Sequence, residues 1–436
     1  MEAVLLREEN ITNAQVPDSS RLTKPQLTDS SKKSLVDQQY RIIGNHSAVK
    51  TCGWTKNMIR GKGGCYKLKF YGIMSNQCMQ MTTSISCANR CTFCWRDYKA
   101  PVSTGWKWAV DDPTMIFEES VKAHHKLLVG FGGSSTKNNV VFEKSKEIKH
   151  VALSLTGEPI MYPRMNELIE TFNKAGISTF LVTRAQYPEA IRDLKPVTQL
   201  YISLDAPNPR LFKDIDVPLF KDYWERFNKG LEYLAGKKQR TTVRLTLIKG
   251  MNMSHFEEYA LMIKKGNPDF IEAKAYMHVG ASQKRLSIES MPMHEEVVGF
   301  SKELAGHLPG YEIVSEHVPS RVVMLAKKKF KIDGIWHTWI DFPKFTELVN
   351  SGKEFSAMDY FRKTPPSLVG LSGKRTPMNG INHDLMGMTS EEQLGLAAQK
   401  NGRDKDTPHE ENGRTPDGKQ ISVDEKTKEM EFWPRD

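Results

Sequence analysis

The stretch "SCANRCTFCWRDY", residues 86–98, places three cysteines within eight residues. They are Cys87, Cys91 and Cys94. The chain has six cysteines in 436 residues, and the other three lie just upstream, at Cys52, Cys65 and Cys78. Because a reducing cytosol disfavours disulfides, clustered thiols in a cytosolic protein more often bind metal or perform redox chemistry. The pattern therefore predicts a metal or redox site.

The composition favours a soluble protein with an anionic partner. The chain carries 62 Lys and Arg against 52 Asp and Glu, a formal net charge of +10. This excess suits RNA or an anionic surface. No apolar run is long enough to span a bilayer, and the polar start lacks a signal-peptide core. We expect a cytoplasmic protein that does not enter a membrane.

The chain divides into three parts by composition. Residues 1–45 read as a polar N-terminal arm, and residues 346–436 read as a C-terminal extension that is largely disordered after about residue 365. The core spans residues 46–345, with the upstream cysteines in residues 50–80.

Within the core, strand-like and helix-like segments alternate. "HVALSLTGEP" reads as a buried strand and "RMNELIETFNKAG" as an amphipathic helix that ends at glycine. Similar cycles follow, from "STFLVT" through "QLYISLDA", "TVRLTLIKG" and "FIEAKAYMHVG" to "YEIVSEHV" and "RVVMLAKK". Repeated β-α units predict parallel strands with right-handed crossovers. The predicted fold class is α/β, a partial (β/α)6 barrel with polar terminal extensions.

Polar residues follow several of the predicted strands, and in such barrels chemistry gathers at the carboxyl ends of strands. Any one of them is more often a turn or capping residue, but together they favour a site. They are Thr156, Gly157, Glu158, Thr183, Arg184, Ser203, Asp205, Lys249 and His278.

The number of cysteines in the loop limits the choice of metal. Structural zinc takes four ligands, usually as two pairs, whereas the loop supplies three thiolates. A [4Fe-4S] cluster held by three cysteines leaves one iron open for a substrate or cofactor. A fourth ligand from Cys78 or from a distant histidine would still permit zinc, so both metals remain open at this point.

The loop resembles the signature of the radical S-adenosylmethionine (SAM) superfamily, C-x3-C-x-aromatic-C, with Phe93 as the aromatic residue. Within it, "CTFCWRDY", "SLTGEP", "YISLDAPN" and "YMHVGAS" resemble the 4-demethylwyosine synthase family over roughly residues 45–345. The resemblance implies a barrel of the radical SAM type. It also implies a reaction that joins two carbons of pyruvate to N1-methylguanosine-37 of tRNA-Phe, forming 4-demethylwyosine.

The resemblance also implies roles for residues of the loop and the strand ends. The loop cysteines would hold a [4Fe-4S] cluster whose open iron binds SAM. Gly157 and Glu158 match the superfamily's Gly-Glu motif, in which a carboxylate binds the SAM ammonium. Ser203 and Asp205 are candidates for ribose or methionine contacts. The structural alternative for Glu158 is a carboxylate at a helix start.

The upstream cysteines are spaced C-x12-C-x12-C, which fits neither helical nor strand periodicity. Buried core thiols are one explanation, but a second metal site explains three equally spaced cysteines better. In the family that the chain resembles, an equivalent triplet holds an additional [4Fe-4S] cluster. Lys67 matches the lysine that the family is proposed to use for a Schiff base with pyruvate. Lys69, two residues later, has no such match and serves as the control position. Pyruvate could instead be chelated by the open iron.

Cations and aromatic residues follow the cluster loop, as contact with phosphates and stacking on an extruded base require. For the tryptophans, packing in the core is the default explanation, and stacking on a base is the alternative. The candidates are Arg96, Lys99, Trp106, Lys107 and Trp108.

The sequence departs from the family pattern after "STFLVT". The family usually has an Asn-Gly turn there, and this chain has Arg184 and Ala185. Arginine replaces a compact amide by a large cation, and loss of glycine restricts a turn of the kind that uses positive φ. The family's local contacts with SAM or substrate are therefore not carried over to these two positions. The sequence before the core also shows no resemblance to a flavodoxin-like domain, as expected of the single-domain form of the family. We therefore expect a single-domain monomer with a separate electron donor, such as a flavodoxin or ferredoxin.

Two other functions stay open. One is a different radical SAM enzyme with an auxiliary cluster, acting on a small molecule or peptide. The other is a zinc-dependent RNA-binding protein without catalysis. The strand-end motifs favour an enzyme, while the six clustered cysteines are compatible with either.

Overall fold

Six parallel strands form the centre of a ten-stranded sheet in the computed structural model, which describes residues 22–372. They are β3 (Cys78–Thr82), β4 (His150–Leu153), β5 (Ser178–Thr183), β6 (Gln199–Ser203), β7 (Arg240–Leu247) and β8 (Phe270–Ala275). Parallel strands that are neighbours in sequence are neighbours in the sheet, so each connection is a crossover to the adjacent strand. The connection from β3 to β4 is long and carries the cysteine loop. The predicted partial (β/α)6 barrel is confirmed.

Antiparallel strands extend both edges of the sheet. On one side β1 (Arg41–Ile43) pairs with β2 (Ser47–Val49), which pairs with β3. On the other side β10 (Val322–Lys327) lies between β8 and β9 (Tyr311–His317). The last two predicted strands are therefore a hairpin rather than a further parallel unit. The connection between them is one short turn, which has no room for the helix that a parallel crossover needs.

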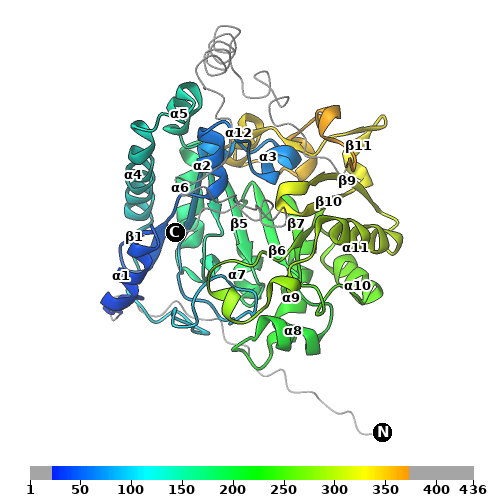
Figure 1. Ribbon diagram of the computed structural model, residues 1–436, viewed down its shortest axis with the longest axis horizontal. Coiled ribbons are helices and arrows are strands. Elements are labelled where there is room, and N and C mark those ends of the chain that lie inside the picture. The colour runs from blue at the N-terminus through cyan, green and yellow to red at the C-terminus, as the bar shows by residue number, and fades with distance from the viewer. Residues whose placement is uncertain (1–21, 373–436) are drawn as a thin grey trace, which may run out of the picture.

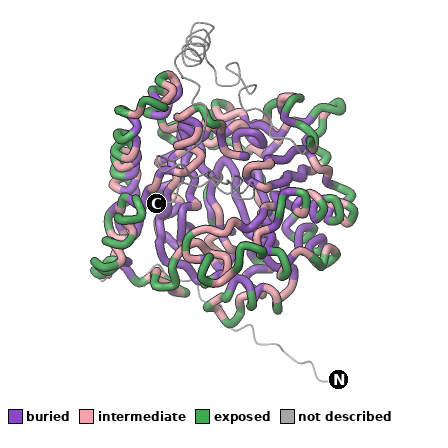
Figure 2. The backbone as a smooth tube through the Cα atoms, in the orientation of Figure 1, coloured by how far each residue is buried: buried purple, intermediate pink, exposed green. Residues whose placement is uncertain are grey.

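Helices cover the outer face of the sheet (Figure 1), and buried backbone is concentrated in the strands between them (Figure 2). Apolar residues on one face of each strand pack against the apolar stripes of these helices in the largest core cluster. The helices are α4 (Pro113–Gly132), α6 (Met165–Lys174), α7 (Pro188–Arg192), α8 (Pro209–Asp216), α9 (Tyr223–Ala235), α10 (Phe256–Gly266) and α11 (His294–Gly306). Helix α5 (Asn139–Ser145) instead packs with Met58 and Ile59 in two smaller clusters. Among the described residues no helix is both long and apolar enough to cross a bilayer.

The inner face of the sheet is closed at one end by aromatic residues. Helix α3 (Tyr66–Tyr71), which follows α2 (Gly53–Ile59), packs Phe70 and Tyr71 against Phe270 of β8 in a second core cluster. In Figure 1, α2 and α3 lie at the end where the parallel strands begin, while α7 and α8 lie where they finish. The inner space between these two ends is where the candidate residues gather.

The N-terminal segment is more ordered than the predicted polar arm. Residues 22–45 include α1 (Asp29–Asp37) and β1, and Leu27 and Tyr40 are buried. The side-chain oxygen of Gln26 accepts hydrogen bonds from the backbone N–H groups of Ile85 and Ser86, at 2.7 and 2.9 Å. This segment therefore supports the loop that carries the three clustered cysteines. Residues 1–21 lie outside the described residues.

The C-terminal boundary also differs from the prediction. Helix α12 (Phe342–Asn350) crosses residue 345, and β13 (Trp339–Ile340) pairs with β14 (Phe361–Arg362). A small hairpin of β11 (Lys331–Ile332) and β12 (Ile335–Trp336) precedes them. The backbone N–H of Gly370 donates to Val314 O at 2.8 Å, so the chain remains attached to the sheet beyond residue 365. The rest of the predicted disordered extension, residues 373–436, lies outside the described residues.

Candidate functional site

The cluster loop, residues 86–98, follows β3 at the carboxyl end of the barrel. The thiols of Cys87 and Cys91 are buried and that of Cys94 is half-buried. Burial raises the pKa of Cys91 well above its usual value, and the charges of Cys94 and Cys87 raise it further. Mutual influence of this kind requires the three sulfurs to be neighbours. The structure thus brings the loop cysteines together as the sequence predicted.

Arg285 fixes the shape of this loop from the other side of the barrel. Its Nε donates to Thr92 O at 2.9 Å, and its Nη2 donates to the carbonyl of Cys94. The guanidinium also lies 4.2 Å from the ring centre of Tyr98. Nothing in the sequence distinguished Arg285, because its partners are backbone carbonyls 189 to 193 residues away.

Gly157 allows the turn after β4 to pack against the cluster loop. Its φ is +67°, and a Cβ built there would lie 2.0 Å from Ser84 O. The next residue, Glu158, donates its backbone N–H to Ser86 O at 2.8 Å. Only glycine fits this close approach, because an added carbon would overlap backbone that cannot move aside.

Glu158 carries an unpaired, buried carboxylate oxygen. The side chain is 1% exposed, and its Oε2 accepts from the backbone N–H of Arg184 at 3.2 Å. Its Oε1 is buried without a hydrogen-bond partner. Burial raises the pKa of Glu158 to about 7. A buried carboxylate oxygen without a partner is costly, and a bound cation such as an ammonium group would satisfy it.

The departure at Arg184 creates a buried ion triad. Its Nη1 lies 2.5 Å from Asp216 Oδ1 and also contacts the carboxylate of Asp205. Asp216 in turn accepts a 3.4 Å hydrogen bond from the thiol of Cys91. Ala185 has a φ of +55°, so the turn keeps the positive φ that glycine would favour. The strain at an alanine in this region is about 1–2 kcal/mol.

Asp205 and Ser203 are both buried at the same end of the barrel. The Oδ1 atom of Asp205 accepts from the backbone N–H of Thr246 at 2.7 Å, and its Oδ2 faces Arg184. Both oxygens of Asp205 are therefore already engaged within the protein. Contacts of Ser203 and Asp205 with SAM stay predictions.

Several buried polar atoms around the loop lack partners within the described protein. They are Ser86 Oγ, Asn89 Oδ1, Asn89 Nδ2, Glu158 Oε1 and Asp216 Oδ2. Buried polar atoms are almost always hydrogen-bonded, so a group of unpaired ones beside three thiols fits a site that receives a polar ligand. The residues at this end therefore fit a [4Fe-4S] cluster with an amino-acid-like cofactor next to it. Asp216 and Asn89 had no sequence signal of their own.

The upstream cysteines meet at the opposite end of the barrel. Cys52 and Cys65 immediately precede α2 and α3, and Cys78 is the first residue of β3. Burial raises the pKa of Cys65 to about 12, and the charges of Cys52 and Cys78 contribute to the rise. Thiols must lose their protons to bind metal, so binding at either set of cysteines releases protons. Three thiol donors without nitrogen or oxygen ligands are the donor set of an iron–sulfur cluster.

The side chains are not gathered around a single point. In residues 22–372, no three His, Cys, Asp or Glu side chains lie close enough together to hold one metal ion. A multi-iron cluster holds its thiolates at separate corners, so this wider spacing is compatible with a cluster at each set.

Lys67 and Lys69 have different surroundings. Lys67 is half-buried, and its Nζ lies 4.7 Å from the ring centre of Tyr201 on the inner face. Its charge lowers the pKa of Cys52, Cys65 and Cys78, which places it among all three thiols. Lys69 is 4% exposed, and burial lowers its pKa while Glu316 opposes that shift.

The two candidate tryptophans are packing residues. Trp108 is buried, and Trp106 packs edge-on against His46 at 4.8 Å while its Nε1 donates to Trp108 O at 2.8 Å. Arg96 donates to the carbonyls of Ile85 and Pro101, whereas Lys99 and Lys107 are exposed. The default explanation of the tryptophans as packing residues therefore agrees with the structure, and the alternative of base stacking finds no support in these contacts.

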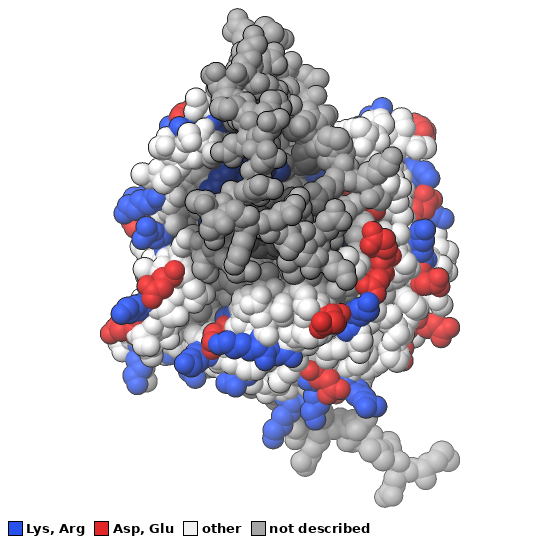
Figure 3. Space-filling view, in the orientation of Figure 1, with Lys and Arg blue, Asp and Glu red and all other residues white. Residues whose placement is uncertain are grey.

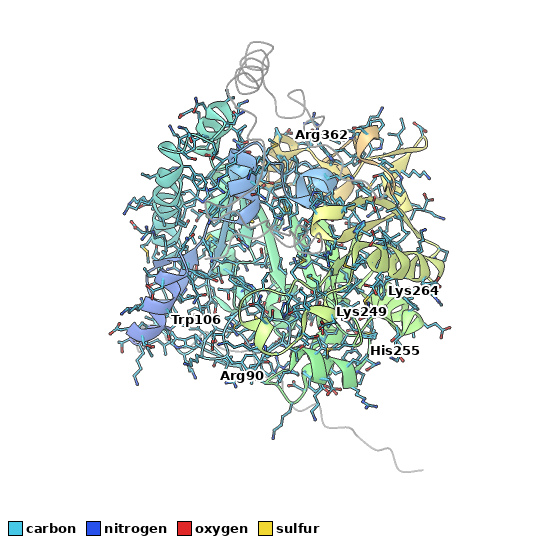
Figure 4. All side chains as sticks on the ribbon, viewed as in Figure 1. Arg90, Trp106, Lys249, His255, Lys264 and Arg362 are labelled. Atoms are coloured by element: carbon cyan, nitrogen blue, oxygen red, sulfur yellow. The ribbon has the colours of Figure 1, made fainter. Side chains whose placement is uncertain are left out.

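Tyr98 offers an alternative platform that the sequence analysis did not single out. It is 39% exposed, and the guanidinium groups of Arg285 and Arg90 lie 4.2 and 6.0 Å from its ring centre. Figure 4 places Arg90 at the end of the barrel where the strands finish and Arg362 at the opposite end. An exposed aromatic ring beside two cations thus lies at the end that carries the cluster loop.

Two family profiles match the chain. One, described as the radical SAM superfamily, matches residues 81–263, and the other, described as wyosine base formation, matches residues 265–327. The two matches together cover the barrel strands from β4 to β8 and the hairpin after them.

Full-length relatives carry the same assignment. The chain is 48% identical over 346 residues to the S-adenosyl-L-methionine-dependent tRNA 4-demethylwyosine synthase TYW1 of Mus musculus, covering 78% of this chain and 48% of that protein. It is 48% identical over 337 residues to the tRNA 4-demethylwyosine synthase of Oryza sativa subsp. japonica, covering 77% and 52%. The chain thus spans about half the length of these curated relatives.

Two solved structures match nearly along their whole length. A structure of TYW1 with a lysine-pyruvate adduct bound has a TM-score of 0.64 at 35% identity, covering 71% of this chain and 99% of that chain. Archaeal TYW1 has a TM-score of 0.58 at 32% identity, with the same coverage. The chain therefore belongs to the TYW1 family of tRNA 4-demethylwyosine synthases, within the radical SAM superfamily.

Proposed function

We propose that this protein joins two carbons of pyruvate to N1-methylguanosine-37 of tRNA-Phe and so forms 4-demethylwyosine. The observation that carries the proposal is the pairing of two cysteine sets at opposite ends of one barrel, with Lys67 among the second set. A radical SAM site alone would not need the second set. Membership of the TYW1 family supports the same reaction.

At the carboxyl end, Cys87, Cys91 and Cys94 would hold the [4Fe-4S] cluster that the superfamily implies. The bound cluster and SAM together supply a radical that removes a hydrogen atom from the N-methyl group of the substrate base. The chain contributes binding and orientation. Glu158 Oε1, which has no partner in the described protein, would accept a hydrogen bond from the SAM ammonium group.

At the other end, Cys52, Cys65 and Cys78 would hold a second [4Fe-4S] cluster. Lys67 would bind pyruvate by attack of its neutral amine on the ketone carbon, which forms an imine and releases one water molecule. The rings of Tyr201 and Phe180, whose centres lie 4.7 and 5.7 Å from Nζ, form an aromatic wall beside that amine. The lysine-pyruvate adduct in a related TYW1 structure supports this assignment.

The tRNA would approach the end of the barrel that carries the cluster loop. Arg90 and Lys99 are exposed there, and Tyr98 presents a ring on which an extruded base can stack. On the face shown in Figure 3, Lys and Arg are interspersed with Asp and Glu and form no single basic stripe. We therefore assign local recognition of the base to this set, and the overall charge of +10 favours RNA in general.

The remaining partners follow from the sequence expectations. We propose a cytoplasmic monomer that receives its electron from a separate flavodoxin or ferredoxin. The need for such a donor comes from the reaction, since reductive cleavage of SAM consumes one electron.

The test is anaerobic reconstitution with iron and sulfide, followed by reaction with SAM, reductant, pyruvate and tRNA carrying N1-methylguanosine. Nucleosides are then analysed by mass spectrometry. A tricyclic nucleoside that requires both pyruvate and the methylated base supports the proposal. Deoxyadenosine without a modified nucleoside would indicate another radical SAM substrate, and stoichiometric zinc with neither product would indicate a non-catalytic RNA-binding protein.

A further inference from the structure

Three cationic side chains lie inside the barrel between the two cysteine sets. Arg244 of β7 is in register with Glu272 of β8, and Thr246 is in register with Lys274. Paired residues on adjacent strands share a face, as do residues two apart on one strand, so Arg244, Glu272 and Lys274 share one face. This is the inner face, because Glu272 accepts a hydrogen bond from Tyr66 of α3 at 2.9 Å.

The single carboxylate in this group is already satisfied. Glu272 is fully buried, and its two oxygens accept from the hydroxyls of Tyr66 and Tyr71 at 2.9 and 2.8 Å. Arg244, Lys274 and Lys67 therefore present more positive charge to the inner space than Glu272 balances. Burying unpaired charges of one sign is energetically costly, and a bound ligand of the opposite sign would reduce that cost.

Arg244 lies between the two ends of the site. Burial opposes its charge, but Tyr66, Glu272 and Asp205 raise its pKa, which links it to both α3 and the carboxyl end of β6. It is half-buried, although most of β7 is fully buried. Part of Arg244 therefore remains accessible on this inner face.

Lys274 is a second donor directed at the same space. Its Nζ makes one hydrogen bond within the described protein, to Ala275 O at 3.3 Å, whereas an ammonium group can donate three. Its charge interacts with Cys65, the same thiol that Lys67 influences. Like Arg244, it is half-buried on a strand that is otherwise buried.

We propose that Arg244 and Lys274 form a carboxylate-binding subsite for a small α-keto acid, next to Lys67. The inference rests on the proposed function for the identity of the keto acid as pyruvate. A guanidinium binds both oxygens of a carboxylate in a fixed plane, and the lysine adds a second charge-assisted donor. Together they would turn the ketone toward Lys67 and select keto acids over neutral ketones.

The experiment measures binding of pyruvate and of neutral pyruvamide by saturation-transfer NMR. It uses the reconstituted full chain carrying Lys67→Met, so that no covalent adduct forms. We expect pyruvate to bind at least tenfold more tightly than pyruvamide, and Arg244→Gln or Lys274→Met to weaken pyruvate binding roughly 10- to 100-fold with little effect on pyruvamide. Lys274→Arg should recover part of the loss, since it keeps the charge.

Lys264→Met is the matched control, because Lys264 is exposed on the outer helix α10 (Figure 4). Iron content and SAM binding equal to those of the parent establish that each variant is folded. Equal affinity for pyruvate and pyruvamide, no pyruvate binding, or undiminished pyruvate binding in both variants would overturn the subsite. Failure of the proposed function would give a different result. The parent protein would then prefer pyruvate over pyruvamide but would make no tricyclic nucleoside in the activity assay.

Discussion

The guanidinium of Arg184 lies 2.5 Å from the carboxylate of Asp216, and the same carboxylate accepts a hydrogen bond from the thiol of Cys91. A second carboxylate, that of Asp205, contacts the guanidinium as well. Asp205 and Asp216 are almost completely buried. Their like charges are tolerated next to three thiols because Arg184 lies between them. The arginine at this turn is therefore part of the support of the cluster loop.

Removing this arginine should destabilise the fold. Arg184→Gln leaves two buried carboxylates without their counter-charge, and we expect the free energy of unfolding to fall by about 3–5 kcal/mol. Urea denaturation followed by circular dichroism measures the change. Adding Asp216→Asn should recover part of the loss, because it removes one of the unpaired charges. A loss below about 1 kcal/mol would mean that the triad is no stronger than a surface ion pair.

Affinity for SAM should depend on the ionisation of Glu158. Burial raises the pKa of Glu158 to about 7, so the carboxylate is mostly protonated at pH 5.5 and half ionised at pH 7. The SAM ammonium stays protonated over this range, so affinity should rise roughly tenfold as the pH increases from 5.5 to 7. Anaerobic calorimetry measures it. Glu158→Gln should bind SAM roughly 10- to 100-fold more weakly and without this pH dependence. A variant that keeps the parent's pH dependence would assign it to another group.

Gly157→Ala should prevent cluster assembly although it removes no ligand. The new carbon would lie 2.0 Å from Ser84 O, so the cluster loop must shift. We expect iron content to fall by the amount of one cluster. Gly176→Ala is the matched control, since Gly176 has a φ of +71° and nothing within 4 Å of the added carbon. It should cost about 1–2 kcal/mol of backbone strain and keep full iron content. Full loading of both variants would show that the close approach is unimportant.

Substitutions in the two cysteine sets should affect different steps of the reaction. Cys91→Ala and Cys65→Ala should each reduce the iron content from about eight to about four per chain. Cys91→Ala should abolish deoxyadenosine formation, because SAM has lost its cluster. Cys65→Ala should still cleave SAM but make no tricyclic nucleoside, because pyruvate has lost its site. Chromatography of both products measures this, and an active Cys65→Ala protein would leave the second set without a catalytic role.

Much of the barrel could be predicted from local pattern. "STFLVT" forms β5 over Ser178–Thr183, and the helix predicted in "RMNELIETFNKAG" is α6, because buried parallel strands and amphipathic helices leave strong periodic signals. The first parallel strand, β3, was not predicted, since its five residues include polar side chains and begin at Cys78. The reversal at β9 and β10 was also missed, because the direction of a strand is decided by pairing across the sheet rather than by its own sequence.

The residues of the candidate site could be predicted where they belong to a short sequence motif. The cysteines, Gly157 and Glu158 stand in short patterns whose chemistry is local. Arg285 and Asp216 act through contacts with residues more than 100 positions away, and Arg244 and Lys274 become a pair only when β7 and β8 align. For the tryptophans the sequence could offer only a default, packing, because a pattern of cations and aromatics near a site does not reveal which ring faces the fold uses.

The most direct test of the proposed reaction uses pyruvate labelled with carbon-13 at all three carbons. The reconstituted protein reacts with SAM, reductant and tRNA carrying N1-methylguanosine, and the modified nucleoside is weighed by mass spectrometry. The account predicts a tricyclic nucleoside heavier by two mass units than the one made from unlabelled pyruvate, because the carboxyl carbon is lost. A tricyclic nucleoside without label, or deoxyadenosine formation with the methylguanosine unchanged, would contradict it.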